Sequence, residues 1–120
     1  MASLEQLRDL VAKLATRSDP SRAPGWIASV GISVAGRRWL KMRADEHGIE
    51  VADWTADGST VSTEIEMSAA GVTAWLLSGI DYTHLLKRGE IEVRSGSQFD
   101  LLLLSKSFGL RPERRQEIVA

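Results

Sequence analysis

Apolar residues recur every three or four positions at the start of the chain, and charged residues fill the positions between them. This spacing predicts an amphipathic helix. Its apolar positions are Leu4, Leu7, Leu10, Val11 and Leu14. Ser3 and Gln6 have the spacing of a capping box at the helix start. Because Pro20 disfavours helix in the residue before it, we expect the helix to end before residue 18 and residues 18–25 to form a connection.

The next part of the chain alternates apolar and polar positions, which is the period of a strand with one face on a core. From residue 26 to residue 34 the apolar side chains fall on the even-numbered positions. Turns at Gly36, Gly48 and Gly58 separate this segment from three further segments. The pattern predicts four strands, at residues 26–34, 38–45, 49–54 and 61–67.

After residue 67 the pattern changes to helical spacing. Ser68, Asp81 and Ser97 are each favourable N-cap residues for a following helix. Pro112 suits the first turn of a last helix. The predicted helices cover residues 68–78, 82–88, 98–108 and 113–119, and a fifth strand covers residues 90–95. A single sheet covered by helices is the simplest way to bury these faces, so we predict one α+β domain over residues 1–120.

Composition excludes several classes of function. The 15 basic and 16 acidic residues leave a net charge of −1, without the basic excess typical of nucleic-acid binding. The absence of cysteine excludes disulfides, thiolate metal sites and a cysteine nucleophile. With only two histidines we expect no metal site, and no motif indicates a cofactor. No apolar stretch approaches the ~20 residues of a membrane span, and the N-terminus lacks a secretory signal, so we expect a soluble cytoplasmic protein.

The second half of the chain resembles sterol carrier protein type 2-like domains. That family has a strand, a helix ending in glycine, a short helix, a second glycine, a strand, a third glycine and a helix. The matching segments are Glu64–Met67, Leu76–Gly79, Tyr82–Leu86, Arg88–Ile91, Gly96 and Leu101–Leu104. The leading helix and the four strands agree in order as well. The chain departs from the family at Ser97, where an acidic or amide residue is frequent, and in having one leading helix where some members have more.

The resemblance implies a five-stranded sheet with helices packed on one face, and an apolar cavity between the two layers that accepts fatty acyl chains or sterols. The expected function is therefore binding or carriage of a hydrophobic, lipid-like small molecule. The candidate cavity residues are Trp75, Leu76, Tyr82, Leu85, Leu86, Phe99, Leu102 and Leu103. Asp81 and His84 are candidates for a polar tether. The same apolar residues also suit a filled core, which periodicity alone favours.

Two other functions stay open. Trp39 and Trp54 alternate with core positions, so an aromatic patch on the outer sheet face would suit a homodimer or a partner enzyme. Some relatives in the resembling family serve as such parts of larger enzymes. Asp81, Tyr82 and His84 would be the polar groups of a small enzyme acting on an apolar substrate. Catalysis is the less favoured interpretation, because Asp81 also suits a helix cap and His84 an exposed helix surface.

Overall fold

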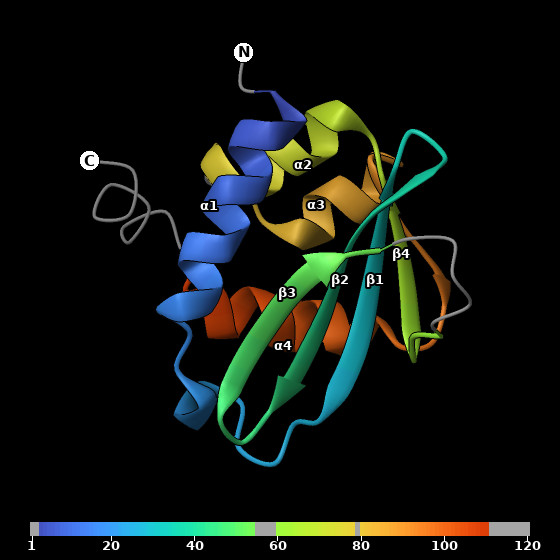
Figure 1. Ribbon diagram of the computed structural model, residues 1–120. Helices are drawn as coiled ribbons and strands as arrows, with labels where there is room; N and C mark the ends of the chain where they lie inside the picture. Colours follow the sequence, from blue (N-terminus) through green and yellow to red (C-terminus); the bar gives the residue numbers. More distant parts are fainter. Residues whose placement is uncertain (1–2, 55–59, 79, 111–120) are drawn as a thin grey trace.

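The computed structural model describes residues 3–54, 60–78 and 80–110, and Figure 1 shows their arrangement. The helices are α1 (Leu4–Thr16), α2 (Ala69–Leu77), α3 (Tyr82–Lys87) and α4 (Gln98–Phe108). The strands are β1 (Ala28–Val34), β2 (Arg37–Asp45), β3 (Gly48–Asp53), β4 (Thr63–Met67) and β5 (Ile91–Ser95). The five strands and the first four helices predicted from the sequence are confirmed. A short 3-10 helix, η1 (Pro20–Arg22), lies in the stretch expected to be a connection, and the helix expected at 113–119 falls outside the described residues.

The five strands form one mixed sheet in the order β3-β2-β1-β4-β5. β4 follows β3 along the sequence, but it pairs in parallel with the central strand β1. The other three pairs of neighbours are antiparallel. Ile32 pairs with Leu40 on one side and with Ile65 on the other, so these three side chains lie on the same face of the sheet.

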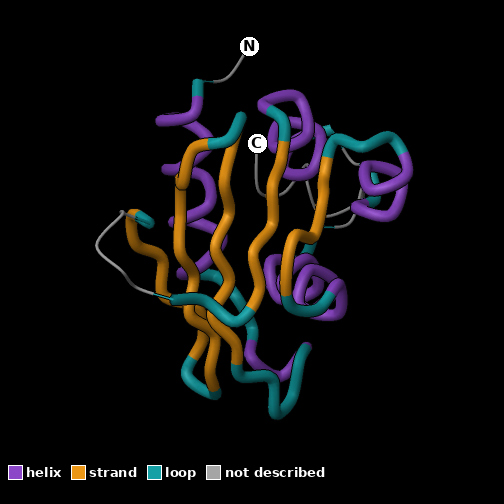
Figure 2. Tube along the Cα trace, turned by 90° about the vertical axis from the view of Figure 1, so that its right-hand side faces the viewer, coloured by secondary structure: helices purple, strands orange, loops and turns teal. Residues whose placement is uncertain are grey.

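The helices lie on one side of the sheet, as expected, and the core fills the space between the layers (Figures 1 and 2). Ile32 and Leu40 are fully buried, and Met42 is 1% exposed. From the helices, Trp75 and Leu104 meet this face and are 1% and 0% exposed. Within residues 3–54, 60–78 and 80–110, no helix combines the length and the apolar character needed to cross a bilayer.

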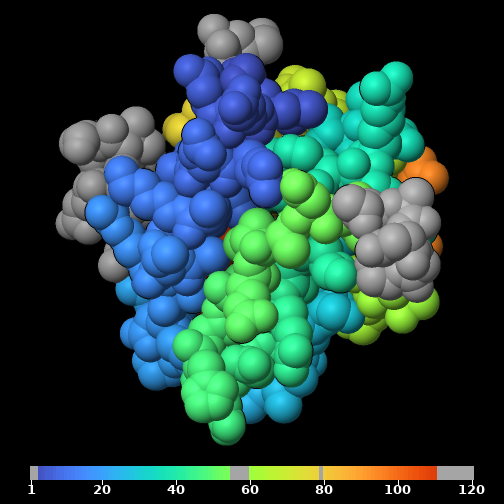
Figure 3. All heavy atoms as spheres, in the orientation of Figure 1, coloured from blue at the N-terminus to red at the C-terminus, as the bar shows by residue number. Residues whose placement is uncertain are grey.

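α1 closes one end of the core along the edge strand β3, and Figure 3 shows the two elements in direct contact. The predicted capping box is present, because the Ser3 hydroxyl accepts from the Gln6 amide at 3.2 Å and the Gln6 side chain accepts from the Ser3 amide at 2.9 Å. An ion pair of 2.8 Å joins Arg8 on α1 to Asp53 at the end of β3. The buried face of the helix consists of Leu7, Val11, Leu14 and Ala15.

The outer face of the sheet carries one large aromatic side chain in a buried position. Trp54 packs against Gly31, where an added Cβ would lie 2.7 Å from the indole ring. The Arg38 guanidinium lies 4.6 Å from the centre of the Trp54 ring, in cation–π geometry. Trp54 is therefore on the outer face, as alternation predicts, but it is only 4% exposed. Trp39 is half-buried and packs against the core, so these two side chains do not form the exposed aromatic patch considered from the sequence.

Candidate functional site

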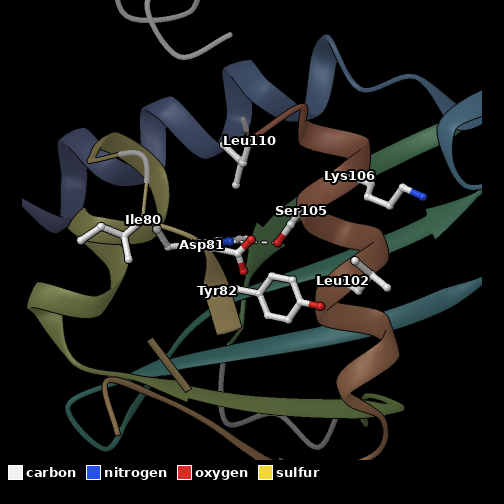
Figure 4. Close-up of a pocket in the computed structure, with 8 residues that line it drawn as sticks. Ile80, Asp81, Tyr82, Leu102, Ser105, Lys106 and Leu110 are labelled. Atoms are coloured by element: carbon white, nitrogen blue, oxygen red, sulfur yellow. Dashed lines mark hydrogen bonds between the residues drawn. The ribbon is translucent and has the colours of Figure 1, made fainter. Parts of the chain in front are cut away.

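A pocket of about 170 Å³ opens between the α2–α3 connection and α4, and we call it the helix pocket (Figure 4). Its lining is mostly apolar, with a few polar groups, as is typical of small-molecule sites. The lining residues are Trp75, Ile80, Asp81, Tyr82, Leu102, Ser105, Lys106 and Leu110. Every one of them lies on α2, α3, α4 or a connection next to these helices.

Trp75 and Ser105 form the floor of the helix pocket. The Trp75 indole N–H donates to the Ser105 hydroxyl at 3.0 Å, and that hydroxyl donates to the Leu101 carbonyl at 2.9 Å. Trp75 also packs against Phe108, with ring centroids 6.1 Å apart. Both polar groups of the floor are thus satisfied within the protein, so the deepest part of the pocket offers apolar contact more than hydrogen bonding.

Asp81 and Tyr82 form one wall of the helix pocket at the start of α3. The Asp81 carboxylate caps this helix, because Oδ1 accepts from the Thr83 amide and from the Thr83 hydroxyl, both at 2.8 Å. These hydrogen bonds, with a smaller contribution from His84, lower the pKa of Asp81 below its usual value of 3.8. Burial, and next the charge of Asp81, raises the pKa of Tyr82 above 10.0. At neutral pH the wall therefore carries an ionised carboxylate beside a protonated phenol.

The opposite wall comes from α4 and its C-terminal turn. Leu102 and Lys106 are one helical turn apart, so they lie on the same side of α4. Gly109 ends the helix in the left-handed conformation, with φ of 68°. In this turn the Leu110 amide donates a hydrogen bond to the Ser105 carbonyl at 3.1 Å, and Leu110 lies in the pocket lining.

The residues proposed from the sequence fall into two groups. Four of them line the helix pocket, and they are Trp75, Asp81, Tyr82 and Leu102. Leu76 and Leu85 are instead buried in the core, at 2% and 0% exposure, and Leu86 is half-buried against that core. The latter three therefore help to hold the helices on the sheet.

Three further candidates lie outside the lining of the helix pocket. Phe99 is 60% exposed in the first turn of α4, and His84 is exposed on α3. Leu103 is half-buried on α4. Because His84 does not join Asp81 and Tyr82 at the pocket, the polar trio considered for catalysis does not meet there.

The location of the helix pocket differs from the expected one. We expected a cavity between the sheet and the helices, but large side chains such as Ile32, Trp75 and Leu104 fill that space. The sequence reasoning also missed four lining residues, Ile80, Ser105, Lys106 and Leu110. The spacing of Ser105 and Lys106 from Leu102 could have identified them, since residues three and four apart share a helix face.

A second hollow, of about 290 Å³, lies between η1 and the β2–β3 turn. Its walls include Pro20, Trp26 and Ile27, with Asp45 and Glu46 at the rim. Ile27 is 77% exposed, so this side chain of the hollow lies mostly in water. The helix pocket lies directly on the core, because its floor residue Trp75 belongs to the core cluster, and we take it as the candidate site for an apolar group. Among the described residues, no group of three or more acidic or histidine side chains is placed to hold a metal ion.

Comparison with solved structures identifies the fold. The palmitated SCP2L2 protein of Aedes aegypti is 16% identical, with 89% of this chain and 95% of that chain aligned and a TM-score of 0.65. Sterol carrier protein-2 of Aedes aegypti in complex with palmitate is 14% identical, with 92% and 99% aligned and a TM-score of 0.56. The sec-alkylsulfatase Pisa1 from a Pseudomonas species is 14% identical, with a TM-score of 0.64, and the match covers 82% of this chain but 15% of that enzyme.

No family model matches the sequence, and no curated protein matches it. The chain has the sterol carrier protein 2 fold, which confirms the fold expected from the sequence resemblance. At 14–16% identity the likeness is one of fold, so the function has to be argued from the site.

Proposed function

We propose that this protein binds a hydrophobic, lipid-like small molecule and that the helix pocket holds its apolar part. The observation that carries the proposal is a mostly apolar pocket with a deeply buried aromatic floor. It is supported by the fold, since two structural neighbours from Aedes aegypti are described with palmitate bound. The apolar walls available to a ligand are Ile80, Tyr82, Leu102 and Leu110, and the buried Trp75 closes the floor below them.

Removal of apolar surface from water would supply the affinity. Each methylene group that leaves water contributes about 0.8 kcal/mol, which corresponds to roughly a fourfold gain in affinity. We therefore expect affinity for a series of primary alcohols to rise by about this factor with each added carbon until the pocket is full. Isothermal titration calorimetry across the series measures the slope. A slope near zero would contradict apolar burial as the source of affinity.

Two leucines on α4 offer a matched pair of variants that tests the position of the site. Leu102 and its neighbour Leu103 are both half-buried, but only Leu102 lines the helix pocket. Leu102→Trp should fill the pocket and reduce alcohol binding at least tenfold. Leu103→Trp should leave binding within about twofold, since both changes add the same volume at the same class of exposure. Equal binding by the two variants would place the ligand elsewhere.

The two other functions are not favoured by a specific observation. Trp54 is buried against Gly31, which removes the main support for a partner surface on the outer sheet face. His84 is exposed and does not line the helix pocket, so Asp81 and Tyr82 lack the base that a small hydrolase would need. Binding without catalysis is the simplest function for this arrangement.

A further inference from the structure

The helix pocket has a negative charge at its exposed rim, on the side chain of Asp81. The Asp81 carboxylate is held by Thr83 through Oδ1 alone. Within the described part of the chain, no hydrogen bond or ion pair is found for Oδ2. Figure 4 shows this carboxylate turned toward the centre of the lining residues, above the ring of Tyr82. One oxygen of an ionised carboxylate is therefore available to a ligand beside an aromatic surface.

The cation that lines the same pocket does not neutralise this carboxylate. Lys106 is exposed on α4, and Figure 4 shows its side chain extending away from Asp81. No described ion pair joins the two side chains. Among residues 3–54, 60–78 and 80–110, the other titratable groups near Asp81 are the Tyr82 hydroxyl and the exposed imidazole of His84, which follows on α3. Of the charged groups that the structure describes, the one that faces the pocket is thus the carboxylate of Asp81.

We propose that the preferred ligand of the helix pocket is an apolar molecule with an ammonium head, which binds Asp81 and lies against the Tyr82 ring. This inference rests on the proposed function and names the class of its ligand. An ammonium group satisfies both features at once, because it pairs with a carboxylate and is attracted to the face of an aromatic ring. A carboxylate head in the same position would meet the like charge of Asp81, which is unfavourable.

Three probes with the same twelve-carbon chain distinguish the contribution of the head group to binding from that of the apolar chain. They are dodecylammonium, dodecanol and dodecanoate. Alkyl amines are protonated at pH 7, as the Lys side chain is. Calorimetric titration at pH 7, below the concentration at which each probe self-associates, gives three dissociation constants. We expect dodecylammonium to bind roughly three- to fivefold more tightly than dodecanol, the range of a partly solvated ion pair, and dodecanoate to bind most weakly. The preference for dodecylammonium over dodecanol should shrink in 0.5 M salt, because the screening length falls to about 4 Å.

Asp81→Asn tests whether the carboxylate of Asp81 recognises the ammonium head of the ligand. Asparagine keeps a carbonyl oxygen for the cap and is as good an N-cap as aspartate, so the variant should fold. We expect it to bind dodecylammonium and dodecanol within about twofold of each other, because the charge that favours the ammonium head is gone. Asp45→Asn is the matched control at the rim of the second hollow, where Oδ1 of Asp45 accepts from the His47 amide at 2.8 Å. It should keep the preference for the amine.

The outcomes separate the two proposals. If dodecanol binds and Leu102→Trp abolishes that binding, but dodecanoate binds the unaltered protein as tightly as dodecylammonium, the ammonium inference fails and the proposed function stands. Loss of the amine preference in Asp45→Asn rather than in Asp81→Asn would also overturn the inference. If none of the three probes binds, the proposed function fails and the inference fails with it.

Discussion

Asp100 ties the start of α4 to the sheet, and its removal should measurably destabilise the protein. Its Oδ1 accepts from the Trp26 indole N–H at 2.9 Å, and its Oδ2 accepts from the Thr63 hydroxyl at 2.6 Å. Thr63 is 1% exposed and also accepts from the Ser97 amide at 3.1 Å. One carboxylate thus links the segment before β1, the first residue of β4 and the first turn of α4.

The magnitude follows from these contacts. Hydrogen bonds to a charged group contribute about 1.5–3 kcal/mol each, and an acid in the first turn of a helix adds about 0.3–1 kcal/mol. Asp100→Ala loses both hydrogen bonds but gains about 0.5 kcal/mol of helix propensity. Together these contributions amount to about 3–6 kcal/mol. Because Asp100 is only half-buried, water can replace part of the lost hydrogen bonds, so we expect the free energy of unfolding to fall by about 3 kcal/mol, the lower end of this range. This is a large share of the 5–15 kcal/mol typical of a domain.

Urea denaturation followed by circular dichroism measures this loss. With a slope of about 1–3 kcal/mol per molar urea, the midpoint should fall by roughly 1.5 M while the slope stays the same. Asp100→Asn retains one acceptor and should lie between the two proteins. Asp9→Ala, at an exposed position on α1, is the control and should change stability by less than about 0.5 kcal/mol. A loss below about 1 kcal/mol in Asp100→Ala would refute the reasoning.

Two further predictions concern α2 and α3. Gly71→Ala should destabilise the protein by about 1–3 kcal/mol despite the better helix propensity of alanine, because the added Cβ would lie 2.5 Å from the Glu90 carbonyl oxygen. Ala70→Gly in the same helix, measured by the same urea assay, gives the effect of helix propensity alone. A gain in stability for Gly71→Ala would contradict the close approach between residue 71 and Glu90. Because the folded-state pKa of Asp81 lies below 3.8, its carboxylate stabilises the fold above that pH and loses this effect as the pH falls further. The unaltered protein should therefore be more stable than Asp81→Asn at pH 7, and this difference should shrink toward pH 3 when urea unfolding is measured at pH 7, 5 and 3. A difference that grew toward pH 3 would contradict the lowered pKa of Asp81.

The sequence predicts the elements well because each carries its own local signal. The period of α1, its Ser3–Gln6 capping box and the alternation in β1 are local features, and all three are present in the structure. The pairing of strands is not local. Alternation along β4 is the same whichever strand lies next to it, so its parallel pairing with β1 could not be derived from the pattern.

The helix pocket was harder to predict than the fold. The run Leu101–Leu104 covers every side of a helix, so periodicity does not show which leucines face the core. The structure turns Leu101 and Leu104 inward at 0% exposure and leaves Leu102 and Leu103 half-buried. Ile80 and Leu110 reach the helix pocket from connections, where side-chain direction depends on the turn and not on a repeating pattern.

Burial on the outer face of the sheet also depends on a contact between distant positions. Trp54 could be assigned to this face by alternation. Its burial, however, requires the space left by the missing side chain of Gly31 on β1. No signal near Trp54 in the sequence indicates that space, which is why the sequence left an exposed aromatic patch open as one of two alternatives.

Native mass spectrometry of the protein purified without detergent tests most directly whether the helix pocket binds a hydrophobic molecule. We expect the unaltered protein and Leu103→Trp to carry, after incubation with dodecanol, a bound mass that denaturation releases. Leu102→Trp, with its helix pocket filled, should appear bare under the same conditions. A bare spectrum for the unaltered protein, or the same bound mass on Leu102→Trp, would contradict binding in the helix pocket.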